Sequence, residues 1–383
     1  MTPKDRAASV VTSARDALVE LSHDLHAHPE TSFHEHRSAS AVAGALAGFE
    51  VDHGACGLET AFSARAGSGP LTVAICAEYD ALPTVGHACG HNVIAAAAVG
   101  AGLALAEVAD DIGLTVLVLG TPAEEGGGGK VFMLERGAFH GVHAAMMVHP
   151  WPEDRLFANC LAVSHFDVSF AGREAHASAA PWQGVNALDA MTVSQVAIGL
   201  LRQQLRPGDQ VHGVVTNGGV AANIIPAAVS ARYMCRASTL EDLEQLDPRV
   251  RACFEAGALA TGASVEFEEI CPVYSHMESD AGLLDAFEIN AEQLGRRFTT
   301  KEPVPTLSTD MANVSLAIPT IHPLLGIDAG GAVNHQPAFA AACAQPSADQ
   351  AVHDGAVAMA WTAIDAATRP ELRERLLAQT PGR

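Results

Sequence analysis

Residues 71–92 read LTVAICAEYDALPTVGHACGHN, and this stretch indicates the fold class of the chain. Leu71–Ala77 is a continuous apolar run, typical of a strand that is buried on both faces of a sheet. A polar loop follows, and an alanine-rich segment from Asn92 to about Ala109 is predicted to be a helix. A buried strand followed by a loop and a helix is typical of an α/β protein with a parallel or mostly parallel sheet.

The same alternation extends toward both ends of the chain. Apolar residues recur every three or four positions from Asp5 to about His28, which predicts an amphipathic opening helix. The pattern further predicts strands at 114–119, 144–148 and 319–325, and helices at 131–136, 281–294 and 349–366. These elements predict one α/β domain that is built from both ends of the sequence.

The middle of the chain has a different pattern, with alternating strands and only two helices. Strands are predicted at 162–171, 211–216, 228–237 and 264–270, and helices at 184–201 and 240–258. Such a compact set indicates an α+β insert. We therefore expect a discontinuous catalytic domain, residues 1–160 and 274–383, that is interrupted by a smaller domain at 161–273.

The composition excludes several classes of protein. The 383 residues are 49% hydrophobic, so disorder is excluded, and the net charge of −22 argues against nucleic-acid binding. The eight cysteines form no C-x-x-C pair, which argues against a disulfide framework or a zinc ribbon. No signal peptide and no apolar run of membrane-spanning length is found, so we expect a soluble, cytoplasmic protein without membrane contact.

Potential metal-binding side chains follow the predicted strands, at the edge where open α/β sheets bind ligands. They are Cys89 and His91 after the first strand, Glu124 and Glu125 after the second, His149 after the third, and His335 in a glycine-rich loop. Thiolate, imidazole and carboxylate together suit zinc, with manganese or cobalt as alternatives. Of the two adjacent carboxylates, one can bind metal while the other takes a proton from water.

Each of these features also has a simpler interpretation. A single loop cysteine is usually a small buried hydrophobe, and an acidic pair is usually solvated at a helix N-terminus. The GGGGK sequence at 126–130 resembles a phosphate loop, but the leading glycine is missing and Val131 stands where Ser or Thr is required. Cys89 with His91 is an alternative as thiol nucleophile and base, although the Glu pair would then have no role.

Seven motifs in one order resemble the M20 metallopeptidase family over nearly the full length of the chain. They are HDLHAHPE at 23–30, DALP at 80–83, HACGH at 87–91, PAEEG at 122–126, GREAHA at 172–177, NIIP at 223–226 and HQPAF at 335–339. The similarity is to the amidohydrolase branch, subfamily D, and within it to the aminoacylase-1-like-2 group. It implies a catalytic domain of zinc-exopeptidase type with an inserted lid and dimerisation domain.

The resemblance also implies a role for individual residues. It implies that one or two divalent ions bind to Cys89, His91, Glu125, His149 and His335. Cys89 would bridge two ions, Glu124 would be the general base that later protonates the leaving amine, and Asp80 would orient a ligand imidazole.

In the insert, the resemblance implies that His176 stabilises the tetrahedral oxyanion, often across a homodimer. Asn223 and Arg236 would hold the free carboxylate of the substrate. Asn92 stands where most of the branch has Asp, which removes a negative charge beside the expected metals.

We therefore expect a metal-dependent amidohydrolase that cleaves the amide bond of a dipeptide or N-acyl amino acid with a free carboxylate. The similar group suggests small or β-alanyl dipeptides with a basic residue. The alternatives are a non-catalytic metal-bearing scaffold of the same fold and a cysteine hydrolase that uses Cys89.

Overall fold

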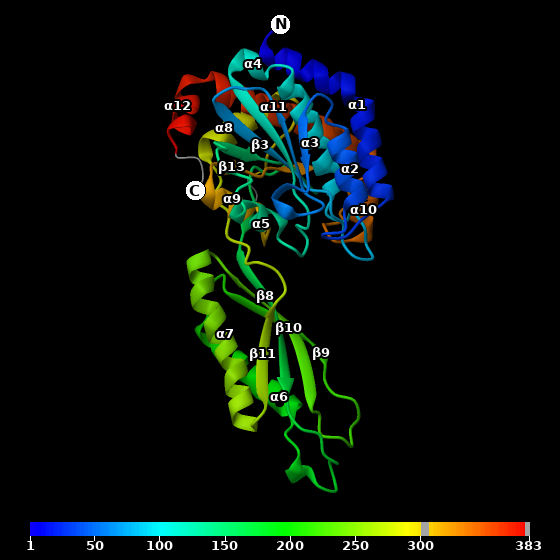
Figure 1. Cartoon of the computed structure of the whole chain (residues 1–383), viewed down its shortest axis with the longest axis vertical. Helices are drawn as coiled ribbons and strands as arrows, with labels where there is room; N and C mark the ends of the chain where they lie inside the picture. The colour runs from blue at the N-terminus through cyan, green and yellow to red at the C-terminus, as the bar shows by residue number, and fades with distance from the viewer. Residues whose placement is uncertain (300–305, 380–383) are drawn as a thin grey trace. The chain divides into compact units, whose positions relative to one another are not determined.

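The computed structural model describes residues 1–299 and 306–379 of the chain. Two compact units are present, one formed by residues 1–159 and 277–383 and the other by residues 160–276 (Figure 1). We refer to them as the main unit and the insert. Among the described residues, no helix is long and apolar enough to cross a membrane.

The centre of the main unit is a six-stranded sheet in the order β1-β2-β4-β3-β5-β13. The strands are β1 (Glu50–His53), β2 (Phe62–Ala66), β3 (Leu71–Ala77), β4 (Leu114–Gly120), β5 (Ala144–Met146) and β13 (Thr320–Ile321). The pairs β3–β4, β3–β5 and β5–β13 are parallel, whereas β1 and β2 form an antiparallel edge. The expected α/β fold with a mostly parallel sheet is confirmed.

Helices cover both faces of this sheet because the central strands are apolar on both sides. Leu71, Val73 and Ile75 of β3 join the core cluster that includes the three long helices, while Ala74 and Cys76 join the cluster on the other face. The long helices on the first face are α1 (Pro3–Ala27), α3 (His91–Ala106) and α11 (Pro346–Thr368), with α8 (Ala281–Gln293) packed on α11. The short helices on the second face are α5 (Gly129–Glu135) and α9 (Met311–Ala317).

The prediction of a single strand at 319–325 is wrong, because the structure forms two strands there, in different sheets. Thr320–Ile321 is β13 of the main sheet, and Leu324–Gly326 is β14, which pairs with β6 (His149–Trp151). Pro323 lies between them and has no N–H to continue the ladder. The sequence pattern also missed β1, β2 and the shorter helices, namely α2 (His36–Gly44), α4 (Ala109–Ile112), α9, α10 (Pro337–Ala342) and α12 (Pro370–Ala378).

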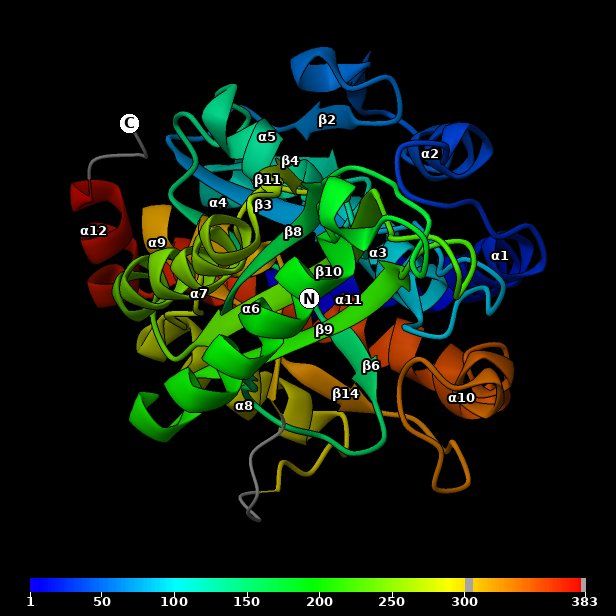
Figure 2. The same ribbon diagram turned by 90° about the horizontal axis from the view of Figure 1, so that it is seen from below.

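The insert is a four-stranded antiparallel sheet in the order β11-β8-β10-β9 with two helices against it. Figure 2 shows α6 and α7 on the same side of this sheet. The elements are β8 (Ala162–Ala171), α6 (Ala187–Leu201), β9 (Gln210–Asn217), β10 (Ala228–Ala237), α7 (Leu240–Thr261) and β11 (Ser264–Glu269). Alternate residues of β10, from Val229 to Ala237, are buried against α6 and α7, which explains the period-two pattern of the sequence.

Candidate metal centre

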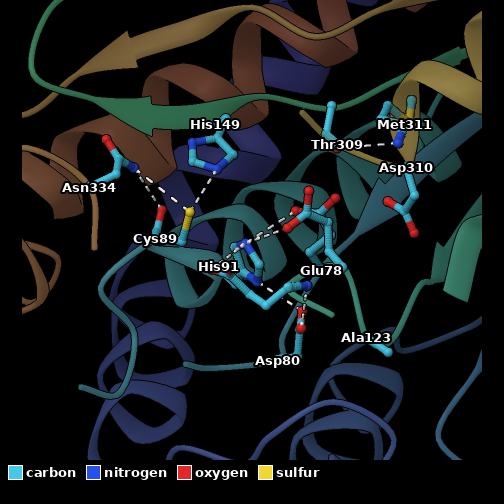
Figure 3. Close-up of polar contacts among 12 residues, drawn as sticks. Glu78, Asp80, Cys89, His91, Ala123, His149, Thr309, Asp310, Met311 and Asn334 are labelled. Carbon is cyan, nitrogen blue, oxygen red and sulfur yellow. Dashed lines mark hydrogen bonds and ion pairs between the residues drawn. The ribbon is translucent and has the colours of Figure 1, made fainter. Parts of the chain in front are cut away.

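The turn between β3 and α3 brings Cys89 and His91 close to the segment after β5. Gly90 has the left-handed φ of 83°, and a Cβ at this position would lie 2.3 Å from Cγ of Pro150. Only glycine satisfies both conditions, since L-residues with side chains rarely adopt this φ. The close approach places His149, which precedes Pro150, beside the thiol of Cys89 (Figure 3).

His335 reaches the same place from the loop before α10. Its φ is 69°, an uncommon value for a residue with a side chain, and its N–H donates to the carbonyl of Ala88 at 2.8 Å. This bond anchors the loop directly beside Cys89. Glu124 and Glu125 follow β4, so four separate loops supply the expected ligands.

The potential ligand atoms of these residues lie close together. The Sγ of Cys89 is 3.5 Å from Nε2 of His149 and 3.6 Å from Nε2 of His335. The Nε2 of His91 lies 3.8 Å from Glu124 and 3.9 Å from Glu125. Among the described residues, four sets have potential ligand atoms within 4.8 Å of one another: Cys89, His91 and His149; Cys89, Glu125 and His335; His91, Glu124 and Glu125; Glu78, Glu124 and Asp310.

These residues fit a divalent metal ion. The Nε2 of His91 and Oε1 of Glu125 are buried without a hydrogen-bond partner among the described residues, which is costly unless another group satisfies them. A cation would satisfy both atoms. Cys89 belongs to two of the four sets, so its thiolate could serve both groups of ligands.

Asp80 holds His91 from the other side. Its Oδ1 lies 2.9 Å from Nδ1 of His91, and its Oδ2 accepts the backbone N–H of Glu125 at 2.9 Å. Burial alone would raise the pKa of Asp80, but His91 and the hydrogen bonds lower it to about 2. Asp80 therefore remains ionised and orients the imidazole with Nε2 toward the expected metal.

Burial also shifts the protonation equilibria of the other groups. It raises the pKa of the Cys89 thiol and of Glu124, the latter also through the charges of Glu78 and Glu125. It lowers the pKa of His149, with a contribution from His322. A metal would therefore have to displace a proton from Cys89 in order to bind its thiolate.

A buried ion cluster, to which the sequence pattern assigned no role, lies beside this pocket. The ammonium of Lys130 lies 2.5 Å from Glu78 and 2.7 Å from Asp310, and all three side chains are fully buried. Glu78 is also 3.5 Å from Nε2 of His91. The position of Glu78 directly after β3 is a signal in the sequence, whereas Asp310 is brought here only by the tertiary fold.

The side chain of Asn92 has a structural role. Its amide donates to the hydroxyl of Ser22 in α1 and to the carbonyl of Cys343, both at 2.9 Å. An aspartate cannot donate these bonds. Asn92 thus joins α3 to α1 and to the turn after α10.

Of the three site residues expected in the insert, the structure brings together two, His176 and Asn223. His176 forms a bridge with Ile224, and the N–H of Ala177 donates to the carbonyl of Asn223 at 3.0 Å. Arg236 lies near the far end of β10, eight residues after the strand begins at Ala228, or about 26 Å along it. One copy of the insert therefore presents Asn223 and Arg236 at opposite ends of its sheet.

Comparison with known sequences places the chain in a family. A profile of the peptidase family M20/M25/M40 matches residues 74–354. The Xaa-Arg dipeptidase of Mus musculus is 38% identical over 97% of this chain and 90% of its own length. The chain belongs to peptidase family M20/M25/M40.

Other members of the M20/M25/M40 family agree with this placement. The Xaa-Arg dipeptidase of Homo sapiens is 34% identical over 97% of this chain and 90% of its own length. A p-aminobenzoyl-glutamate hydrolase polypeptide of Escherichia coli is also 34% identical, over 69% of this chain and 60% of its own length. The expected amidohydrolase branch and the assignment as a metal-dependent, amide-hydrolysing enzyme are confirmed.

Solved structures support the fold. A putative aminohydrolase from methicillin-resistant Staphylococcus aureus has a TM-score of 0.78 at 20% identity and covers 94% of this chain and 99% of its own. A Bacillus subtilis protein described as a dinuclear metal-binding peptidase of the M20 family has a TM-score of 0.66 at 24% identity, with coverage of 90% and 98%.

Proposed function

We propose that this chain is a dipeptidase that hydrolyses the peptide bond before a C-terminal arginine or another basic residue. The supporting observation is the convergence of the five potential metal ligands and Glu124 in one largely buried cluster, of which His335 is exposed. The substrate class is suggested by the relatives named Xaa-Arg dipeptidases. The net charge of −22 also attracts cationic substrates.

The metal would be held by Cys89, His91, Glu125, His149 and His335. Zinc suits this mixture of thiolate, imidazole and carboxylate best, with manganese or cobalt as alternatives. When bound, a divalent ion polarises the amide carbonyl and makes water more acidic.

Glu124 is the proton carrier of the proposed reaction. It lies in the turn after β4, 3.8 Å from Nε2 of His91 and in the same buried pocket. Its carboxylate takes a proton from the attacking water and later gives it to the leaving amine. Burial of this carboxyl keeps bulk water from competing for the proton.

The insert, residues 160–276, is the proposed lid and dimerisation domain. His176 would donate a hydrogen bond to the developing oxyanion, and Arg236 with Asn223 would bind the substrate carboxylate. Because Arg236 lies about 26 Å along β10 from the end of the sheet near Asn223, a single substrate meets both only if two copies contribute. This separation supports a homodimer.

An exposed apolar stripe on α6 is a candidate surface for that dimer. Apolar side chains at spacings of three and four residues lie on one side of a helix. The stripe consists of Val193, Val196 and Leu200, the last of which is 70% exposed.

A cytoplasmic location remains a prediction, which cell fractionation would test.

The proposed activity is tested with purified protein and a panel of dipeptides and N-acyl amino acids. We expect one to two metal ions per chain by elemental analysis and faster release of arginine from Xaa-Arg than of a neutral or acidic residue. Chelation should abolish turnover, and added zinc should restore it. Glu124→Gln should lower turnover by about 10²–10⁴-fold with little change in bound metal. Turnover by metal-free protein, or near-native turnover by Glu124→Gln, would contradict the mechanism.

A further inference from the structure

Buried carboxyl groups hold the backbone on both sides of Glu124. On one side, the N–H of Glu125 donates to Oδ2 of Asp80 at 2.9 Å. On the other side, the N–H of Ala123 donates to Oε1 of Glu35 at 2.9 Å. Both carboxyl groups are almost completely inaccessible to solvent. Asp80 also orients His91, but the proposed reaction assigns no role to Glu35.

The turn at Ala123 needs such support. Ala123 has a φ of 60°, a left-handed conformation that residues other than glycine, asparagine and aspartate rarely adopt. A strained backbone of this kind persists only where its surroundings hold it. The hydrogen bond from Ala123 to Glu35 acts directly on the strained residue, one position before Glu124.

The loop that carries Glu35, residues 31–35, also contacts Asp80 and the turn itself. The hydroxyl of Ser32 donates to Oδ2 of Asp80 at 3.1 Å. The ring of Phe33 packs so tightly on Gly127 that a Cβ on this glycine would lie 2.4 Å from Cε2 of the ring. Phe33 is itself left-handed, with a φ of 61°. The loop is therefore a brace for the turn and not merely a connection between helices.

We propose that Glu35 is a positioning residue for the general base, because its carboxyl fixes the backbone at Ala123 and thereby the direction of the Glu124 side chain. This inference rests on the proposed role of Glu124. It requires only an acceptor oxygen at position 35, because a carboxyl group retains one whether or not it is protonated. Glutamine retains that acceptor, whereas methionine has a similar shape but only a weakly accepting sulfur.

The test compares Glu35→Met with Glu35→Gln in the metal-loaded enzyme on an Xaa-Arg dipeptide. For Glu35→Met we expect at least a tenfold loss of kcat, with KM and metal content within about twofold of wild type, since small misplacements of a reacting group are costly. Glu35→Gln should stay within about threefold of the wild-type kcat. Unchanged kcat in Glu35→Met, or equal losses in both variants, would overturn the proposal.

A second measurement does not depend on activity. Hydrogen–deuterium exchange of the peptide covering residues 121–129, without substrate, should be faster in Glu35→Met than in Glu35→Gln, because Ala123 loses its acceptor. Equal exchange in the two variants would overturn the proposal. If Glu35→Met does not fold, Glu35→Asp withdraws the oxygen by about one carbon–carbon bond, and an unchanged kcat and exchange rate would again overturn it.

Two control variants distinguish a positioning role of Glu35 from a loss of stability and from a failure of the proposed function. Asp365→Asn weakens a partly buried ion pair with Lys4, on the helices α1 and α11, and should leave kcat unchanged. A loss of kcat in Asp365→Asn as large as that in Glu35→Met would show a general effect of destabilisation and overturn the proposal. Glu124→Gln tests the proposed function itself, because its activity depends on the base and not on Glu35.

Discussion

Asp80 and His91 form a fully buried pair in which Oδ1 of the carboxylate lies 2.9 Å from Nδ1 of the imidazole. An ionised carboxylate only accepts hydrogen bonds, so Nδ1 of His91 carries a proton. Burial lowers the pKa of His91, but the charge and hydrogen bond of Asp80 outweigh it and raise the pKa well above its ordinary value. Nε2 faces Cys89 and the glutamates, and a metal would have to displace its proton in order to bind there. The pair therefore determines which nitrogen of His91 acts as a ligand.

Asp80→Asn should weaken metal binding. The neutral amide no longer stabilises the Nδ1–H tautomer, and losses of about 10–100-fold in metal affinity are typical when such a partner of a ligand histidine is removed. Competition with a chromogenic chelator would measure the zinc affinity. Asp365→Asn, which alters a buried carboxylate of α11, is the matched control. Equal affinity in wild type and Asp80→Asn would show that the carboxylate does not orient His91.

Lys130→Met should destabilise the main unit by about 3–5 kcal/mol, because the carboxylates of Glu78 and Asp310 remain buried without their cation. The matched control is Lys4→Met, which breaks the ion pair between Lys4 and Asp365. The side chain of Lys4 is 26% exposed. Partly exposed pairs contribute about 1 kcal/mol or less. Urea denaturation would measure both losses. Similar losses of stability in Lys130→Met and Lys4→Met would contradict the prediction that the buried cation contributes more.

Glu35 should make stability depend on pH. Burial, together with the charge of Asp80, raises the pKa of Glu35 from 4.5 to about 7. Between these values the folded chain keeps a proton that the unfolded chain has released, so the free energy of unfolding falls as the pH rises. The full effect is about 3 kcal/mol at about 1.4 kcal/mol per unit.

The comparison of wild type with Glu35→Gln isolates this contribution, because the other titrating groups are common to both. Tyr79 and Asp80 face Glu35 and keep their protonation states across this range. Between pH 5 and pH 7.5 in urea denaturation, the free energy of unfolding of wild type should change by up to about 3 kcal/mol in the destabilising direction relative to that of Glu35→Gln. Identical differences would mean that Glu35 titrates at its ordinary pKa in the folded chain.

Mixing two inactive variants should restore activity if two copies build each site. His176→Ala and Arg236→Ala should each lose most of their turnover. After the two are unfolded together and refolded, half of the dimers are mixed, and each mixed dimer has one complete site. About a quarter of the wild-type activity should therefore return. Sites built within one chain would recover nothing above the two separate variants.

The sequence identified much of the site because parallel strands impose a simple rule. Their carboxyl ends lie at one edge of the sheet, so polar residues directly after β3, β4 and β5 converge in space. Cys89, His91, Glu124, Glu125 and His149 were all expected on this basis, and the structure places them in one pocket. Their assignment as ligands and base remains a prediction for the metal and activity measurements.

Local patterns were less informative where side chains from distant segments meet. Glu35 resembles an ordinary helix-start acid, yet it accepts the N–H of Ala123. Asp310 precedes a short helix and carries no local signal, although it is ion-paired with Lys130. The strand expected at 319–325 is divided because Pro323 interrupts it.

The sequence by itself determined the α/β class, the presence of an insert and the chemical types that converge, because these follow from apolar periodicity and from the chain order of strands and loops. Only the tertiary structure decided which groups hold those residues in place. Asp80, Glu35 and Lys130 contact residues that lie 11, 88 and 180 positions away in the sequence. Arg236 is separated from Asn223 by the length of strand β10. Such relations depend on packing and strand register, which no local pattern of residues encodes.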